Sequence, residues 1–249
     1  LLLLLLQQFL WVTIVSSSSS LPTPSKVYCG SVEIPYPFGV IDGTQNSAAP
    51  GFEVGCGILH PTLNISGLQI LDISLDDGHV RVSAGAIAQH CGGDPPGAPD
   101  TVTQSSSWVD LEGTLFTFSN TSNRFTVIGC DALSMIQVPP SRRFTSGCVA
   151  FCDANEGPLD LACSGVGCCQ SAIPPGLRSF NLKFSSVGLP NASSGVASFD
   201  KCSKAFLTQH DLFSFTSDLL IDVKRLALCD PVCAWALRSS VCVCLGSVK

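Results

Sequence analysis

The sequence predicts a mostly β fold: a disulfide-rich extracellular domain of short antiparallel strands and hairpins, with little helix. Three observations support this prediction. Apolar and polar residues alternate with a period of two wherever a pattern is clear. Fourteen cysteines occur in 249 residues, and all of them follow the first 25 residues. The chain opens with an apolar segment of the kind that directs export. A disulfide-stapled β domain that folds where thiols are oxidised accounts for all three.

The N-terminal segment 1–25 is predicted to be a signal peptide. Its apolar part runs from Leu1 to Val15, is interrupted by Gln7 and Gln8, and leads into a run of serines. At about 15 residues it is shorter than the ~20 residues that a membrane-spanning helix needs. A membrane anchor is the alternative. Neither Met nor a basic residue precedes Leu1, so we expect the signal peptide to be N-terminally incomplete.

The cysteines are even in number, as expected if they pair as disulfides. Zinc ligation is the alternative, because Cys148 and Cys152 are spaced like metal ligands. Export favours disulfides. Adjacent Cys168 and Cys169 should have different partners. The predicted disulfide cysteines are Cys29, Cys56, Cys91, Cys130, Cys148, Cys152, Cys163, Cys168, Cys169, Cys202, Cys229, Cys233, Cys242 and Cys244.

Charge and motifs narrow the functional classes. The 13 basic and 19 acidic residues give a net charge of −6 without a block of like charges, so nucleic acid is not an expected partner. The sequence has no nucleophile elbow, zinc-protease motif, phosphate-binding loop or kinase motif, so no enzyme is predicted. A hydrolase with carboxylates on distant strands is the alternative. The histidines lack metal-ligand spacing, so neither metal nor cofactor is predicted. Three sequons predict N-glycosylation at Asn64, Asn120 and Asn191.

Two hairpins are predicted from local patterns. Residues 71–75 and 80–82 alternate apolar and polar side chains on either side of the turn pair Asp77-Gly78. Residues 115–118 and 125–128 flank a polar turn in the same way.

Two more strands and one helix are expected in the second half. Alternation predicts strands at 180–184 and 212–215. Apolar residues from Leu219 to Ala227 have the spacing of one face of a short helix, with Ser217 as its cap.

The segment 92–107 is rich in Gly, Pro, Ser and Thr and has no periodicity, which is typical of a loop or linker. It would separate two lobes of the domain. The predicted organisation is a signal peptide at 1–25, an N-terminal cysteine-rich β lobe at 26–91, the linker at 92–107, a second cysteine-rich β lobe at 108–215 and a divergent cysteine-containing tail at 216–249.

One proline-rich string, CGSVEIPYPFG, begins at Cys29. Its two prolines restrict the backbone and keep the residues before them out of the helical region. In an extended chain Ile34, Tyr36 and Phe38 share a face. Tyr36 and Phe38 could therefore form an aromatic ledge that stacks on sugar rings. The alternative is that both rings fill the core.

Several further strings follow in a characteristic order. They are PGFEVGC at 50–56, GHVRV at 78–82, FTFS at 116–119, NRFTVIGCD at 123–131, GCVAFC at 147–152 and CSGVGCCQ at 163–170. Together with CGSVEIPYPFG, they resemble the galacturonan-binding, cysteine-rich ectodomain of plant wall-associated receptor kinases. The resemblance covers about residues 29–215.

The chain departs from the family pattern in two places. No Cys lies within 40–50, where family members usually carry one, so the pairing among Cys29, Cys56 and Cys91 stays open. Near the end, CDPVCAWA at 229–236 stands where family members have a Leu-x-Trp-Ala element. This tail could be native sequence, the start of a following module or the product of an incorrect gene model.

The resemblance implies an extracellular polysaccharide-binding module for pectin (homogalacturonan) of the plant cell wall, located in the apoplast. Homogalacturonan is a polyanion, so its binding face should offer Lys or Arg, or hold calcium between carboxylates. Because the net charge is negative, the attraction has to come from a local patch. The candidate ligand-binding residues are Tyr36, Phe38, Arg81, Arg124, Arg142, Arg143, Lys201 and Lys204.

A secreted cysteine-rich module that binds a protein ligand is the alternative function. A truncated receptor ectodomain is a second alternative, because family members commonly continue into an EGF-like module, a membrane span and a kinase. Association with a membrane is expected only in that case, and no cytosolic partner is expected in any.

Overall fold

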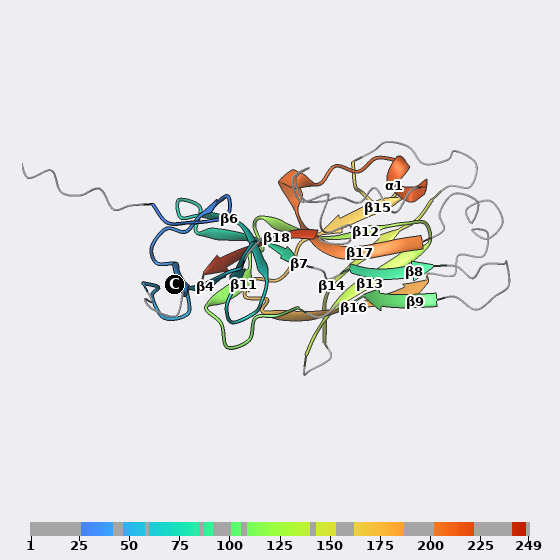
Figure 1. Ribbon diagram of the computed structural model, residues 1–249. Helices are drawn as coiled ribbons and strands as arrows, with labels where there is room; N and C mark the ends of the chain where they lie inside the picture. The colour runs from blue at the N-terminus through green and yellow to red at the C-terminus, as the bar shows by residue number, and fades with distance from the viewer. Residues whose placement is uncertain are drawn as a thin grey trace, which may run out of the picture.

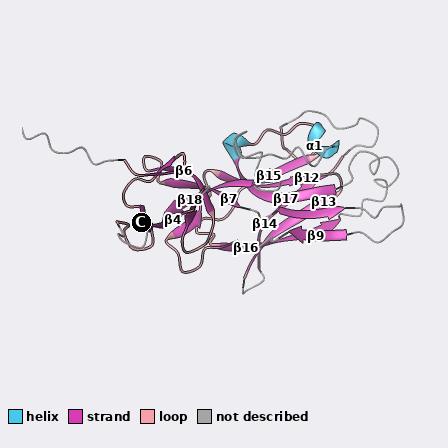
Figure 2. Ribbon diagram, viewed as in Figure 1, coloured by secondary structure: helices cyan, strands magenta, loops and turns pink. Residues whose placement is uncertain are grey.

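The computed structural model describes residues 26–41, 47–57, 60–84, 87–91, 101–105, 109–139, 143–152, 162–186, 202–221 and 241–247. These residues form a mostly β structure with four sheets, as the sequence predicts (Figure 1). Helix in the described ranges is limited to a 3-10 turn, η2 (His210–Leu212), and to α1 (Asp218–Ile221) (Figure 2). In the same ranges, no helix has the length and apolar character required to cross a bilayer.

The largest sheet has seven strands in the order β11-β18-β7-β6-β5-β4-β3. The strands are β3 (Gly39–Ile41), β4 (Glu53–Cys56), β5 (Pro61–Leu63), β6 (Gln69–Ser74), β7 (His79–Ala84), β11 (Phe116–Phe118) and β18 (Val241–Ser247). Only β3 and β4 run parallel. β18 comes from the predicted tail, and it is inserted between β11 and β7. A separate two-stranded ladder joins β1 (Tyr28–Cys29) to β2 (Val32–Glu33).

Two further sheets pack against each other. The five-stranded sheet has the order β15-β12-β17-β8-β9, and the four-stranded sheet has the order β10-β16-β13-β14. Their strands are β8 (Ile87–Cys91), β9 (Thr101–Ser105), β10 (Val109–Asp110), β12 (Asn123–Ile128), β13 (Ala132–Val138), β14 (Arg143–Ala150), β15 (Cys168–Ser171), β16 (Ser179–Ser186) and β17 (Cys202–Gln209). Figure 1 shows them at the end of the molecule opposite β4 and β6.

The main hydrophobic core joins all three large sheets. Phe125 of β12, Ile136 of β13 and Val82 of β7 are all completely buried and belong to one cluster. At the centre of this core, the rings of Phe118 and Phe180 meet edge to face with centroids 5.1 Å apart. Such an aromatic pair stabilises a core by about 0.5–1.5 kcal/mol beyond the area that it buries.

The first predicted hairpin is confirmed, with one irregularity. β6 and β7 pair antiparallel, and Gly78 takes a positive φ of 64° in the turn. A bulge between Ile70 and Asp72 shifts the register, so Ile70 opposes Val82 and is buried. The alternation from residue 71 predicts the strand correctly, but Leu71 is only half-buried because the bulge interrupts the alternation there.

The second predicted hairpin is wrong, although both of its strands exist. β11 pairs with β18 in the seven-stranded sheet, whereas β12 pairs with β15 and β17 in the five-stranded sheet. The tight turn between them is real, because the Asn123 N–H donates to the Ser119 carbonyl at 3.1 Å. This turn passes the chain from one sheet to another instead of folding it back.

Other local predictions have mixed outcomes. The strand at 180–184 is confirmed as β16. The strand expected at 212–215 is wrong, because η2 ends at Leu212 and the next four residues form no strand. The expected helix begins after Ser217 but is described only as far as Ile221, and 222–240 lie outside the described residues.

The segment expected to be a linker contains a strand. Residues Thr101–Ser105 form β9, which pairs with β8 along its whole length. β8 in turn pairs with β17. Since β8 belongs to the expected N-terminal lobe and β17 to the expected second lobe, strand pairing joins the two. Residues 92–100 and 106–108 lie outside the described residues.

Ten cysteines pair within the described residues, which confirms disulfides over zinc for these positions. The bridges are Cys29–Cys56, Cys91–Cys202, Cys130–Cys152, Cys148–Cys169 and Cys163–Cys168. Adjacent Cys168 and Cys169 have different partners, as predicted. Cys229 and Cys233 lie outside the described residues, and Cys242 and Cys244 belong to β18.

Candidate functional site

The proline-rich string folds into a turn that presents one tyrosine to solvent. The Phe38 N–H donates to the Pro35 carbonyl at 2.9 Å, and the Tyr36–Pro37 peptide is cis. Tyr36 is 76% exposed, whereas Ile34 and Phe38 are buried. The predicted ledge of two rings on one face is therefore wrong, because the turn reverses the chain between them.

Phe38 anchors the turn in the core. Its ring meets Phe52 edge to face at 5.0 Å and stacks on Phe116 at 6.2 Å. It is thus a core residue, and its ring is not exposed for stacking on a sugar. Tyr36 projects from a loop that is fixed by buried neighbours, and an aromatic ring held in this way loses little conformational entropy when it binds a ligand.

Charged and aromatic side chains lie next to this turn in the chain. Tyr28 of β1 opposes Glu33 of β2 and is 54% exposed. The Lys26 Nζ donates to the Glu33 carboxylate at 2.8 Å, and the Tyr28 hydroxyl donates to it at 3.3 Å. We call Lys26, Tyr28, Glu33 and Tyr36 the N-terminal aromatic surface.

The Lys26–Glu33 contact perturbs both groups. The hydrogen bond from Lys26 holds the pKa of Glu33 below its ordinary value, and the same bond raises the pKa of Lys26. The lowered carboxyl pKa means that the attraction persists at neutral pH and is lost as the pH falls through that pKa. Both side chains are exposed, so solvent screens the pair and its effect on stability is small.

The predicted cationic residues that the structure describes lie on four different strands. Arg81 of β7 forms an ion pair with Asp72 at 3.5 Å. The Arg124 guanidinium donates to the carbonyls of Asn120, Thr121 and Asn123 at 2.9–3.3 Å, so it braces the turn before β12.

The remaining predicted cations belong to other strands or lie outside the described residues. Lys204 is half-buried in β17, and Arg143 is exposed at the start of β14. Arg142 and Lys201 are not among the described residues. Of the predicted sequons, Asn64 and Asn120 are exposed, while Asn191 is also outside the described residues. In the part of the chain that is described, no three His, Cys, Asp or Glu side chains come together as a metal site.

The structure also reveals a surface that sequence reasoning missed: the outer face of the four-stranded sheet. Cross-strand pairing places Gln137 of β13 beside Phe144 of β14, and Leu133 beside Val149. The residues that alternate with them, such as Cys148 and Ala150, are buried. We define the outer face by Met135, Gln137, Phe144, Val149, Asn181 and Lys183, with Phe151 just beyond the end of β14.

The sequence gives little sign of this face. Cys148 and Ala150 are small apolar residues, and nothing in the string GCVAFC marks them as more buried than Val149 and Phe151. The Cys148–Cys169 bridge decides the orientation, because it pins the even-numbered side of β14 against β15.

Comparisons with known proteins bear on the first of these surfaces. The sequence model of the family described as wall-associated receptor kinase galacturonan-binding matches residues 23–84, which include the N-terminal aromatic surface. No solved structure matches the chain.

Relatives align over most of the chain. Wall-associated receptor kinase 3 of Arabidopsis thaliana is 28% identical over 236 residues, which cover 90% of this chain and 30% of the relative. Wall-associated receptor kinase 5 is 27% identical over 219 residues, covering 86% and 28%, and wall-associated receptor kinase 1 is 24% identical over 232 residues, covering 89% and 29%. This chain thus spans about a third of the length of these relatives. Residues 23–84 thus match the galacturonan-binding region of wall-associated receptor kinases, and the chain as a whole resembles the ectodomain of these receptors.

Proposed function

We propose that this chain binds the pectic polysaccharide homogalacturonan outside the cell and that Tyr36 is one of its contacts. The observation that carries the proposal is the family match over residues 23–84, a region in which the Tyr36 side chain is 76% exposed. Exposed aromatic rings stack on the C–H faces of sugars, and the tyrosine hydroxyl adds a polar handle. A fixed, exposed tyrosine in the matched region is therefore the candidate stacking platform.

Lys26 supplies the charge that an acidic sugar requires. Its side chain is 65% exposed, and an ammonium group attracts a uronate carboxylate as a point charge. The chain carries a net charge of −6, so such attraction acts only at short range. The Glu33 carboxylate competes with the uronate for the Lys26 ammonium, so it weakens the attraction between Lys26 and the ligand.

The proposed place of action is the apoplast, or the extracellular side of the plasma membrane if the chain is part of a receptor. The matching relatives are receptor kinases aligned over their ectodomain, and the five disulfides require an oxidising compartment. Export through the signal peptide 1–25, and glycosylation at Asn64, Asn120 and Asn191, belong to the same proposal. We propose a binding module without catalytic turnover, so incubation with polygalacturonate should release no shorter oligosaccharides.

Replacing Tyr36 with alanine is expected to weaken binding to polygalacturonate about tenfold, equivalent to about 1.4 kcal/mol, because the stacking ring is lost. Binding is measured by calorimetry on the secreted, disulfide-bonded protein. Since Tyr36 is mostly exposed, the melting temperature should change little.

Two further variants sharpen this test. Tyr36→Phe retains the ring and should keep most of the affinity. Leu75→Ala removes an apolar side chain that is 48% exposed in the same matched region, and it should have no effect. Equal losses in Tyr36→Ala and Leu75→Ala would contradict a specific role for the ring. Retention of a protein from wall extract, without affinity for polygalacturonate, would favour the protein-binding alternative.

Glu33→Gln is expected to raise the affinity for polygalacturonate about two- to threefold at neutral pH. The change removes a carboxylate that repels the polymer and frees Lys26 to contact it, and exposed charge pairs are worth at most about 1 kcal/mol. The gain should diminish as salt is added. Lys26→Gln is the opposite variant and should lower the affinity. Repeating both titrations with EDTA tests whether calcium bridges contribute. An unchanged affinity in both variants would remove Lys26 and Glu33 from the site.

A further inference from the structure

The outer face of the four-stranded sheet is built from cross-strand rows of side chains. Phe144, Gln137 and Asn181 form one row, because Gln137 pairs with both of the others, and a bulge shifts the β13–β14 register between Ile136 and Gln137. The next row centres on Met135, which lies between Gly147 and Lys183. Rows of this kind repeat about every 7 Å along the strands, and neighbouring strands lie about 4.8 Å apart.

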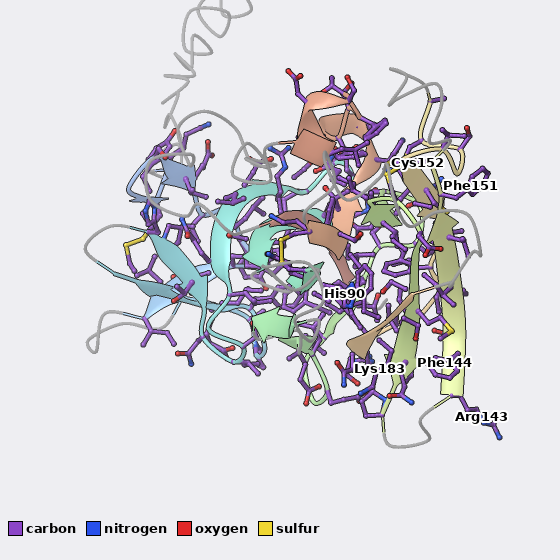
Figure 3. The ribbon with its side chains drawn as sticks, turned by 90° about the vertical axis from the view of Figure 1, so that its right-hand side faces the viewer. His90, Arg143, Phe144, Phe151, Cys152 and Lys183 are labelled. Carbon is purple, nitrogen blue, oxygen red and sulfur yellow. A yellow bond between two sulfur atoms is a disulfide. The ribbon has the colours of Figure 1, made fainter. Side chains whose placement is uncertain are left out.

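Aromatic and apolar side chains follow the β14 edge of this face. Phe144 is 55% exposed, Val149 is 39% exposed and Phe151 is 47% exposed. Figure 3 shows Arg143 and Phe144 at one end of β14 and Phe151 with Cys152 at the other. Six residue steps of the paired strand separate the two rings, which corresponds to about 20 Å. That distance suits an elongated ligand better than a single small molecule.

Gly147 lies between Phe144 and Phe151 and has no side chain, so the surface is lower at this position. A Cβ at this position would meet Met135 Cγ at 3.4 Å and the Ser134 carbonyl oxygen at 3.6 Å, so a side chain could be added without a clash. A ligand that rests on Phe144 can therefore pass over Gly147 and contact Met135.

The strands of this face contain basic but no acidic residues, and Asp131 lies just before β13. β13, β14 and β16 contain Arg143 and Lys183 but no Asp or Glu, whereas the chain carries a net charge of −6. The only carboxylate in the described strands of this sheet is that of Asp110 at the far edge, which accepts the Glu112 N–H. These three strands also lack a sequon, so no N-glycan is attached to them.

Exposed aromatic rings, amide side chains and a lysine are a combination that suits an acidic polysaccharide. The rings stack on sugar faces, the amides of Gln137 and Asn181 suit hydroxyl groups, and Lys183 attracts a carboxylate. A protein partner fits this face less well, because in the described residues no apolar groove accompanies the exposed side chains along β14.

We propose that the outer face is a second binding surface for acidic polysaccharide, separate from the N-terminal aromatic surface. The inference rests on the proposed function and extends it to longer polymers. Figure 1 places residues 28–41 at one end of the molecule and β13, β14 and β16 toward the other. A long chain that reaches both surfaces gains affinity from the high effective concentration of its second segment, whereas a short oligomer binds only one surface.

The test compares long polygalacturonate with a short oligogalacturonide on the full chain. The double substitution Phe144→Ala and Phe151→Ala is expected to lower the affinity for the long polymer at least about tenfold, while affinity for the oligomer through the Tyr36 surface changes less than twofold. Ile65→Ala with Leu212→Ala is the matched control, since both side chains are similarly exposed on other elements. This control should leave both affinities unchanged.

A second variant tests the outer face without disturbing the packing of the sheet. Gly147→Glu adds a carboxylate to the middle of the outer face without removing any packing, and Ser214→Glu adds the same charge at an exposed position outside the sheets. Only Gly147→Glu should weaken binding of the long polymer. The loss should be smaller for fully methyl-esterified polymer, which carries no carboxylates.

The outcomes separate the two proposals. Loss of long-polymer affinity in Phe144→Ala/Phe151→Ala and in Gly147→Glu supports the inference. Unchanged long-polymer affinity in both variants overturns the outer face as a site and leaves the Tyr36 proposal intact. Failure of the unsubstituted protein to bind either ligand overturns both proposals. Reduced capture of a protein, with polymer binding unaffected, would also overturn the inference.

Discussion

A chain truncated after residue 240 is expected not to fold. β18 lies inside the seven-stranded sheet, where it pairs with β7 over six residues and with β11 over three. Its removal would leave facing edges of both strands without hydrogen-bond partners beside a core that includes Val82 and Phe118. Each unsatisfied buried backbone group costs about 1–3 kcal/mol, so a few of them exceed the typical stability of a domain, about 5–15 kcal/mol.

The truncation is checked by secreted yield and by the thermal unfolding transition. The truncated chain should be retained or degraded, or should lack a cooperative transition. Removal of residues 248 and 249 alone is the control, because it leaves β18 intact. A truncated chain that still unfolds cooperatively within a few degrees of the full chain would show that β18 is dispensable.

Replacing both Cys91 and Cys202 with serine should be the most damaging loss of any disulfide described. The bridge closes a loop of 111 residues, the longest among the five. In the chain-entropy model, a crosslink over about 100 residues stabilises the fold by about 4.7 kcal/mol. The same model gives about 2 kcal/mol for Cys163–Cys168, whose separation is only 5 residues. The two double variants therefore differ mainly in loop length.

Guanidinium unfolding measures both double variants under non-reducing conditions. Replacing both cysteines of a pair avoids a free thiol that could exchange with the remaining bridges. The midpoint should fall further for Cys91→Ser/Cys202→Ser than for Cys163→Ser/Cys168→Ser. Equal midpoints, or the reverse order, would mean that strain or packing around the bridges outweighs loop closure.

Local patterns predict local structure in this chain, and they fail where strand partners are distant. The Asp77-Gly78 turn joins two strands that pair with each other, so their alternation predicts the hairpin. The polar turn after Ser119 also separates two alternating segments, but β11 pairs with β18, which lies far later in the chain. Sequence periodicity carries no information about which strand lies alongside.

The two proposed binding surfaces show the same limit at the level of single side chains. The two prolines beside Tyr36 predict a constrained backbone, but an extended backbone and a turn both satisfy that constraint and place the ring differently. Burial distinguishes the turn from the extended backbone, because Ile34 and Phe38 both lie in the core and Tyr36 is exposed. The outer face was missed because disulfide pairing, and not hydrophobicity, sets which side of β14 is buried.

The position of β18 has a consequence for how the protein is made. Because synthesis proceeds from the N-terminus, β7 and β11 are made long before β18, their shared neighbour. The seven-stranded sheet closes only after residues 241–247 have been made, and until then two strand edges are open to incorrect pairing. The interval between the synthesis of β11 and that of β18 is therefore the period in which this sheet is most exposed to mispairing.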